Sequence, residues 1–393
     1  MLNYESILSN VVQEMKPSGI RRFFDLAATM DDVISLGVGE PDFSTPWSIR
    51  KEAIDVLERR KIVYTANAGL AQLREEVSAY QERKIHTHYD PEHEIVITVG
   101  GSEAIDISVR GLVNPGDEVL IVEPSFVCYA PIVQMAGGIP VPIPTKQENH
   151  FKLTAQELRE KITDKTKLLV LPFPNNPTGA IMTREDLEQI AEILRDTNIM
   201  ILSDEIYSAM TYGKKHCSIV EIDGMKERTV VVDGFSKAFA MTGWRLGYLC
   251  APEPVAKQLV KIHQYIIMSS PTVSQYAAIT ALKECEHDVE RMVKEYNIRR
   301  RYLVEAFNRI GMTCFSPEGA FYVFPSIQNT GMSSEEFCEK LLEEERVAVV
   351  PGNAFGESGE GFVRVSYAYS LRHLMEAVSR MTRFLEKHGG NHE

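Results

Sequence analysis

Short apolar runs rich in β-branched residues alternate with helix-period segments between about residues 46 and 287, and this alternation constrains the fold more than any other feature. It predicts an α/β domain, a mostly parallel sheet between two layers of helices. Ligands of such sheets bind beyond the carboxyl ends of the strands, so the residues after each run are candidates for a functional site. The runs are Glu94–Val99, Glu118–Val122, Lys167–Leu171, Ile199–Leu202 and Thr229–Val232.

The length of 393 residues exceeds the size at which one hydrophobic core usually stops growing. We therefore expect a large domain over residues 46–287 and a smaller α+β domain made of residues 1–45, with an N-terminal arm, and 288–393. A long helix is expected over about 288–310. Its run of three arginines, residues 299–301, stands among charges of both signs, so we expect a solvated face there.

Charge and composition exclude several classes of protein. The formal net charge of −13 disfavours nucleic acid and anionic membranes as partners. No apolar stretch is long enough to span a bilayer, and the first residues do not resemble a signal peptide, so we expect a cytoplasmic protein. The six cysteines lack C-x-x-C spacing and the ten histidines are dispersed, so we expect free thiols and no metal site.

Glycines, a hydroxyl, an aromatic ring and an amide follow the first three runs. Gly101 and Ser102 open a helix, where backbone N–H groups can meet a phosphate. Phe126 either stacks on a flat ligand or packs in the core. Asn176 lies in a turn rich in Pro, Asn and Gly, and it either shapes the turn or donates a hydrogen bond into the cleft.

The last two runs are followed by groups suited to covalent chemistry. Asp204 ends the fourth run with Tyr207 three residues later, and both are expected to face one pocket; helix capping is the alternative for Asp204. Lys237 follows the fifth run and is placed to form a Schiff base. Eight residues on, Arg245 is flanked by glycines and can hold a phosphate. Each of these two residues alone would suggest a surface side chain, but together they predict a cofactor that carries an aldehyde and a phosphate.

Two further segments complete the expected site. Strand alternation in residues 363–367 places Arg364 opposite the valines, so we expect it to point into a cleft between the domains, with a surface ion pair as the alternative. The early glycine-rich segment 35–43 lacks the third glycine of a dinucleotide loop, which argues against NAD. Gly39 is expected to let a substrate approach the backbone closely.

In this order, and over nearly the whole chain, these motifs resemble fold-type I pyridoxal-5′-phosphate enzymes, specifically the class I/II aminotransferases. The similarity is to the prokaryotic subgroup that includes aspartate, aromatic, alanine and N-acetyl-diaminopimelate aminotransferases. It rests on G-x-G-E-P-D-F, Y-T-x-N-A-G, N-N-P-T-G, S-D-E-I-Y, S-K, T-G-W-R-L-G, G-A-F-Y and V-A-V-V-P-G.

The resemblance implies roles around the cofactor ring. Lys237 would bind the cofactor covalently and then move a proton as a general acid/base. Asp204 would keep the ring nitrogen protonated, which makes the ring an electron sink. Asn176 and Tyr207 would hydrogen-bond the phenolic oxygen of the ring, and Phe126 would stack on its face.

It also implies how the anionic groups are held. The phosphate would lie against Arg245, the backbone of Gly101 and Ser102 and the Ser236 hydroxyl, and Tyr64 would reach it from the second subunit of a homodimer. Arg364 would form a bidentate contact with the substrate α-carboxylate, a geometry that lysine cannot reproduce, and the backbone of Gly39 would approach the same group.

Two departures from the family pattern bear on specificity. Gly234 stands where many members have a serine or threonine that binds phosphate, and Ser236 is expected to compensate. Ser102 stands where some aspartate-specific members have a lysine, so strict aspartate preference is disfavoured. The sequence therefore predicts a ping-pong aminotransferase that acts on alanine, an aromatic or another neutral amino acid, with 2-oxoglutarate and glutamate as the expected second pair. Aspartate or N-acetyl-diaminopimelate specificity is the alternative, and a C–S β-lyase is less favoured.

Overall fold

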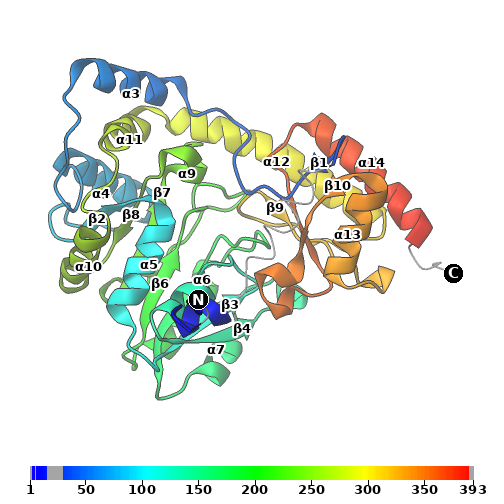
Figure 1. Ribbon diagram of the computed structural model, residues 1–393, viewed down its shortest axis with the longest axis horizontal. Coiled ribbons are helices and arrows are strands. Elements are labelled where there is room, and N and C mark those ends of the chain that lie inside the picture. The colour runs from blue at the N-terminus through cyan, green and yellow to red at the C-terminus, as the bar shows by residue number, and fades with distance from the viewer. Residues whose placement is uncertain (1, 5, 16–29, 389–393) are drawn as a thin grey trace.

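The computed structural model describes residues 2–4, 6–15 and 30–388 (Figure 1). A seven-stranded sheet has the strand order β2-β8-β7-β6-β5-β3-β4. Strand β8 is antiparallel to both of its neighbours, whereas all other pairings in this sheet are parallel. The predicted mostly parallel sheet is therefore confirmed. Its strands are β2 (Ile95–Thr98), β3 (Glu118–Glu123), β4 (Ile139–Pro144), β5 (Thr166–Leu171), β6 (Met200–Asp204), β7 (Thr229–Gly234) and β8 (Gly247–Cys250).

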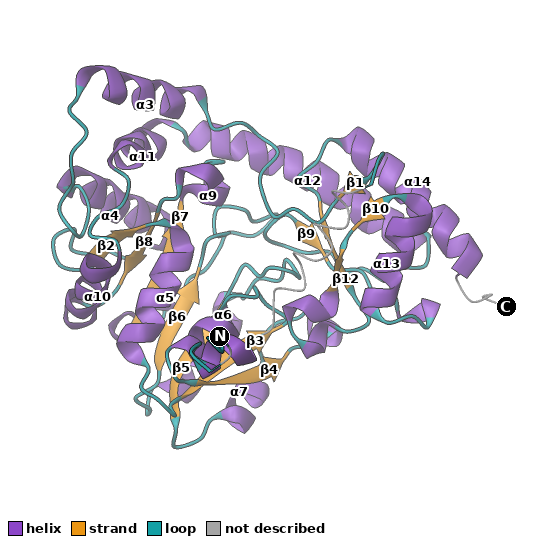
Figure 2. Ribbon diagram, viewed as in Figure 1, coloured by secondary structure: helices purple, strands orange, loops and turns teal. Residues whose placement is uncertain are grey.

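Helices cover both faces of this sheet, as Figure 2 shows. Consecutive residues of a strand belong to different apolar clusters: Leu169 of β5 and Val231 of β7 pack on one face, and Val170 and Val232 pack on the other. Burial on both faces explains why these strands are continuous apolar runs. The helices are α3 (Trp47–Arg59), α4 (Ala71–Ile85), α5 (Gly100–Leu112), α6 (Tyr129–Met135), α7 (Ala155–Lys161), α8 (Arg184–Leu194), α9 (Phe235–Ala238), α10 (Glu253–Ile266) and α11 (Thr272–Glu284).

The C-terminal third forms a second group of elements, and α12 (Glu286–Arg309) runs between the two groups (Figure 1). A three-stranded antiparallel sheet has the order β11-β12-β9, and a short parallel pair joins β1 to β10. The expected α+β character is present. The remaining elements are α1 (Asn10–Glu14), β1 (Ile34–Ser35), β9 (Tyr322–Val323), α13 (Ser334–Glu345), β10 (Val347–Ala348), β11 (Val350–Pro351), β12 (Val363–Ser366) and α14 (Leu371–His388).

The domain boundaries near residues 46 and 287 stay a prediction. Residues 1, 5 and 16–29 of the expected N-terminal arm lie outside the described residues. No helix in the part of the chain that the structure describes is both long and apolar enough to cross a membrane. All six cysteines are free.

The expectation of a solvated arginine face on α12 is wrong for Arg299. This side chain is buried, and its Nη1 donates to both carboxylate oxygens of Asp42, at 2.8 and 2.9 Å. Its guanidinium also lies over the rings of Phe43 and Tyr296. Arg299 therefore fastens the segment after β1 to α12, and that segment contributes to the pocket described next.

Candidate active site

The carboxyl ends of the parallel strands open onto a pocket of about 740 Å³. The structure brings together there all the predicted site residues except Tyr64, whose side chain is exposed elsewhere on the surface. Because strand ends of a parallel sheet meet at one edge, residues far apart in sequence converge. The predicted residues in the pocket lining are Gly39, Gly101, Ser102, Phe126, Asn176, Asp204, Tyr207, Ser236, Lys237, Arg245 and Arg364.

Lys237 lies on α9, which begins directly after β7, and its Nζ donates to the backbone oxygen of Gly39 at 2.7 Å. Burial lowers the pKa of Lys237 from 10.5 to about 8. The charge of Glu40 opposes this shift, whereas those of Arg364 and Arg245 add to it. A fraction of this amine is therefore neutral near pH 7, as a nucleophile requires.

Asp204 is the last residue of β6 and is buried. Its Oδ1 accepts from the backbone N–H of Ile206 at 3.2 Å, and its Oδ2 accepts from the hydroxyl of Tyr129 at 2.6 Å. Burial raises the pKa of Asp204 to about 6, and the hydrogen bond from Tyr129 opposes that rise. Helix capping, the alternative considered for Asp204, is wrong because a turn follows β6.

Sequence reasoning missed Tyr129. It stands three residues after Phe126 and opens α6, and both side chains line the pocket. The two rings meet edge to face at 6.1 Å between centroids. Phe126 lies before the first residue of α6, so helical periodicity does not link the two residues, and no local pattern singled out Tyr129.

Arg364 lies on β12 and is buried, which excludes the alternative of a surface ion pair. Its Nη1 donates to Asn176 Oδ1 at 2.8 Å and its Nη2 to the backbone oxygen of Gly37 at 2.5 Å. The guanidinium lies over the rings of Tyr322 and Phe355, 4.5 and 4.8 Å from their centroids. Since the amide oxygen of Asn176 is used by Arg364, its NH₂ group is left to donate into the pocket.

Arg245 has a left-handed backbone, with φ 50°, at the end of a short 3₁₀ helix, and its Nη1 donates to the backbone oxygen of Thr242 at 3.1 Å. The guanidinium lies against the start of α5: a Cβ on Gly100 would stand 2.7 Å from Nη2. A Cβ on Gly247 would stand 2.6 Å from the backbone of Gly100. A fixed cation thus meets the N-terminus of a 13-residue helix, and both attract anions.

Tyr207 is buried at the same edge, and its hydroxyl lies 2.8 Å from that of Tyr322. Tyr322 is a second residue that sequence reasoning left without a role in the site. Together the pocket offers a reactive amine, a buried carboxylate, two fixed guanidinium groups and the ring of Phe126. This set suits a flat ligand that carries an aldehyde, an anionic group and a basic ring nitrogen.

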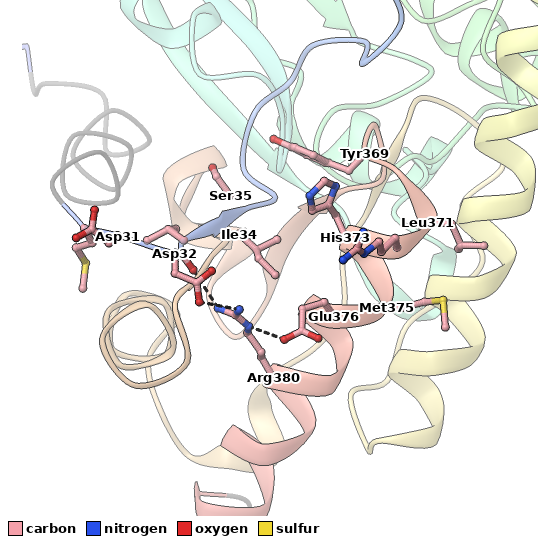
Figure 3. A pocket seen from close by; sticks show the side chains of 13 residues that line it. Asp31, Asp32, Ile34, Ser35, Tyr369, Leu371, His373, Met375, Glu376 and Arg380 are labelled. Carbon is pink, nitrogen blue, oxygen red and sulfur yellow. Dashed lines mark hydrogen bonds and ion pairs between the residues drawn. The ribbon is translucent and has the colours of Figure 1, made fainter.

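A second hollow, of about 1440 Å³, lies between β1 and the start of α14 (Figure 3). Arg380 crosses its lower edge and pairs with Asp32 and Glu376, each at about 3 Å from nitrogen to oxygen. Both of these carboxylates are more than half exposed. The hollow contains none of the predicted site residues, and the two carboxylates that pair with Arg380 there are solvated, so the smaller pocket at the strand ends is the candidate site.

Comparisons with known proteins agree with this geometry. The family described as "Aminotransferase class I and II" matches residues 31–381. The chain is 53% identical to the putative aminotransferase YugH of Bacillus subtilis, covering 97% of this chain and 99% of the relative. It is 44% identical to an aspartate aminotransferase of Pyrococcus abyssi, covering 97% and 98%. The crystal structure of an aromatic aminotransferase from Pyrococcus horikoshii OT3 superposes with a TM-score of 0.89 at 44% identity, covering 94% and 99%.

Proposed function

The chain belongs to the class I and II aminotransferase family, and from that premise we propose that it moves the amino group of a neutral or aromatic L-amino acid to a 2-oxo acid. The reaction is a pyridoxal-5′-phosphate-dependent transamination. In the proposal, glutamate and 2-oxoglutarate form one substrate pair. Alanine, an aromatic amino acid or another neutral amino acid supplies the other pair, in a ping-pong cycle.

The charges that line the pocket carry the substrate part of this proposal. Among the described lining residues the cations are Lys237, Arg245 and Arg364, and each is assigned below to the cofactor or to the α-carboxylate. Ser102 brings no charge, and Glu40 adds a negative one. The short side chain of aspartate therefore finds no further cation here, whereas an apolar side chain needs none. The longer side chain of glutamate is proposed to extend its carboxylate beyond these residues.

The pocket fits the phosphate of the cofactor because Arg245 touches the start of α5. We assign the phosphate to the Arg245 guanidinium, to the backbone N–H groups of Gly101 and Ser102 and to the Ser236 hydroxyl. In this assignment Ser236 supplies the hydroxyl that Gly234 lacks.

When bound, the cofactor supplies a conjugated ring that accepts the electrons left at the amino-acid Cα after proton loss. Asp204 is assigned to the ring nitrogen, where a carboxylate favours protonation of that nitrogen. Lys237 anchors the cofactor and, once released, takes the proton from Cα as a general base. Tyr207 and the NH₂ group of Asn176 are assigned to the phenolic oxygen, and Phe126 to the ring face.

Arg364 is assigned to the α-carboxylate of the substrate. A planar guanidinium held by Asn176 and Gly37 is fixed before the substrate arrives, which favours a bidentate contact. Gly39 is assigned to the same carboxylate through its backbone, which in the structure accepts a hydrogen bond from Lys237.

A homodimer is part of the proposal because large apolar side chains lie exposed beside Tyr64. Tyr64 and Tyr265 are 79% and 89% exposed, and Ile62 and Met268 are also exposed. The segment that holds Ile62 and Tyr64 and the segment that holds Tyr265 and Met268 are in contact, because Asn67 Nδ2 donates to the backbone oxygen of Met268 at 2.8 Å. Such a patch fits a protein partner better than water. We assign it to a second copy, into whose pocket Tyr64 reaches; sedimentation showing a monomer would contradict this.

The test of the function is the absorbance of the purified enzyme during addition of single amino acids without an oxo acid. Conversion of the cofactor to its amine form, with release of the matching oxo acid, supports the proposal and ranks the donors. If aspartate or N-acetyl-diaminopimelate reacts best, the enzyme is still an aminotransferase, but the proposed neutral or aromatic donor is wrong. Catalytic release of ammonia and pyruvate from a β-substituted amino acid would favour a C–S β-lyase instead.

A further inference from the structure

Tyr322 contacts two groups of the site at once. It lies on β9 beside β12 and is fully buried at the pocket wall. Its hydroxyl stands 2.8 Å from the hydroxyl of Tyr207, and its ring lies under the guanidinium of Arg364, 4.5 Å from centroid to Cζ. It therefore bridges the residue assigned to the substrate carboxylate and a residue assigned to the cofactor ring.

The direction of the hydrogen bond between the two hydroxyls follows from their proton supply. Each phenol has one proton to donate. If Tyr207 gives its proton to a ligand oxygen in the pocket, Tyr322 must be the donor in the bond between them. The positive charge of Arg364 opposes the burial that raises the pKa of Tyr322, so it makes this hydroxyl a stronger donor. Hydrogen bonds in such a chain strengthen one another.

Packing fixes the Tyr322 hydroxyl in this position. A Cβ on Gly39 would stand 2.6 Å from the hydroxyl oxygen, so the backbone of the loop closes over it. The rings of Phe321 and Tyr207 pack against the ring of Tyr322, at 4.9 and 5.8 Å between centroids. The hydroxyl is therefore held toward Tyr207.

We propose that Tyr322 is a positioning residue that turns the Tyr207 hydroxyl toward the phenolic oxygen of the cofactor and links that hydrogen bond to the charge of Arg364. The inference rests on the proposed roles of Tyr207 and Arg364. It implies that a substrate carboxylate bound at Arg364 weakens the donation by Tyr207, because it neutralises the charge that strengthens Tyr322 as a donor.

The test uses Tyr322→Phe, which keeps the ring under Arg364 and removes only the hydroxyl. A weaker donor at the phenolic oxygen favours the protonated form of the bound cofactor. We therefore expect the pH midpoint of the cofactor absorbance change to rise by about 0.3 to 1 unit. Tyr212→Phe is the matched control, since its buried hydroxyl donates to Ala320 O and it does not line the pocket. Thermal denaturation of both variants reports any loss of stability.

A double variant separates positioning from direct contact. If Tyr322 acts through Tyr207, the shift caused by Tyr322→Phe disappears when Tyr207 is already phenylalanine. An unchanged midpoint in Tyr322→Phe, an equal shift in Tyr212→Phe, or a shift that persists without the Tyr207 hydroxyl would each overturn the inference. Absence of any cofactor band in the wild-type protein would overturn the proposed function itself, so the two failures are distinct.

Discussion

Replacement of Arg364 by lysine tests how the site holds a carboxylate. The guanidinium donates to Asn176 and Gly37 and lies over two aromatic rings, those of Tyr322 and Phe355. This fixes the plane in which its remaining N–H groups face the pocket. Lysine keeps the positive charge, but its ammonium is a single centre and cannot hold both acceptors and present a planar fork.

The expected cost follows from these contacts. If Arg364 holds the substrate carboxylate as proposed, the variant loses one of two charge-assisted hydrogen bonds, each worth about 1.5–3 kcal/mol. This corresponds to a loss of about 10- to 150-fold in kcat/KM. Because the carboxylate is bound both before and during the reaction, most of the loss should be a rise in KM, with a smaller change in kcat.

The assay is single-turnover transamination of L-phenylalanine and L-alanine, followed by cofactor absorbance over a range of substrate concentrations. Arg300→Lys is the matched control: Arg300 lies over the Tyr212 ring at 5.1 Å, donates to Ser316 and Pro317, and is outside the pocket. Saturation at the wild-type concentration in Arg364→Lys would refute the assignment. A similar loss in Arg300→Lys would show that stability alone is being measured.

Three other predictions concern the cofactor. The pKa of Lys237 is about 8, so the rate at which the cofactor-free protein binds pyridoxal phosphate should rise with pH and level off above about pH 8. Glu40→Gln should move this plateau to lower pH, because the charge of Glu40 raises the pKa of Lys237. Stopped-flow absorbance measures both effects. Tyr129→Phe removes a hydrogen bond that keeps the pKa of Asp204 down, so the acidic limb of the kcat/KM profile should move up by about one pH unit. Gly247→Ala places a Cβ against the backbone at the start of α5, so it should weaken cofactor affinity by about 5- to 100-fold. A fluorescence titration measures this affinity, and an unchanged value would contradict the close contact.

The sequence predicted the position of a site residue correctly where that residue directly follows a buried strand. All five predicted runs are strands, because burial on both faces leaves a continuous apolar signal. The chemistry after each run then meets at one edge. Two strands of the seven-stranded sheet escaped prediction. β4 contains three prolines and lies at the sheet edge, where prolines are tolerated, and β8 follows the glycine-flanked Arg245 and runs antiparallel to its neighbours.

Contacts between distant segments were not predictable. The sequence of its helix predicts a solvated side chain for Arg299, and its burial is explained by the ion pair with Asp42, which is distant in sequence. Tyr322 likewise stands in an apolar stretch, and its proximity to Tyr207 depends on how the small sheet meets the large one. Local patterns specify which face of a strand is buried, but not which remote side chain it will meet.

The charge of the pocket differs in sign from the charge of the chain, and this difference bears on how anionic ligands reach it. The chain carries a formal charge of −13, which taken alone would repel phosphates and carboxylates. Three cationic and two anionic side chains line the described pocket, Lys237, Arg245 and Arg364 against Glu40 and Asp204, which leaves one positive charge when all are ionised. At physiological salt, charges farther than about 8 Å apart in solvent are largely screened. The net positive charge of the pocket, which lies in a partly desolvated cleft, therefore determines whether anionic ligands are attracted to it. Burial also shifts Lys237 and Asp204 toward their neutral forms, because it lowers the pKa of the amine and raises that of the carboxyl. An anionic group bound near Lys237 and a basic nitrogen bound near Asp204 would each favour the charged form again.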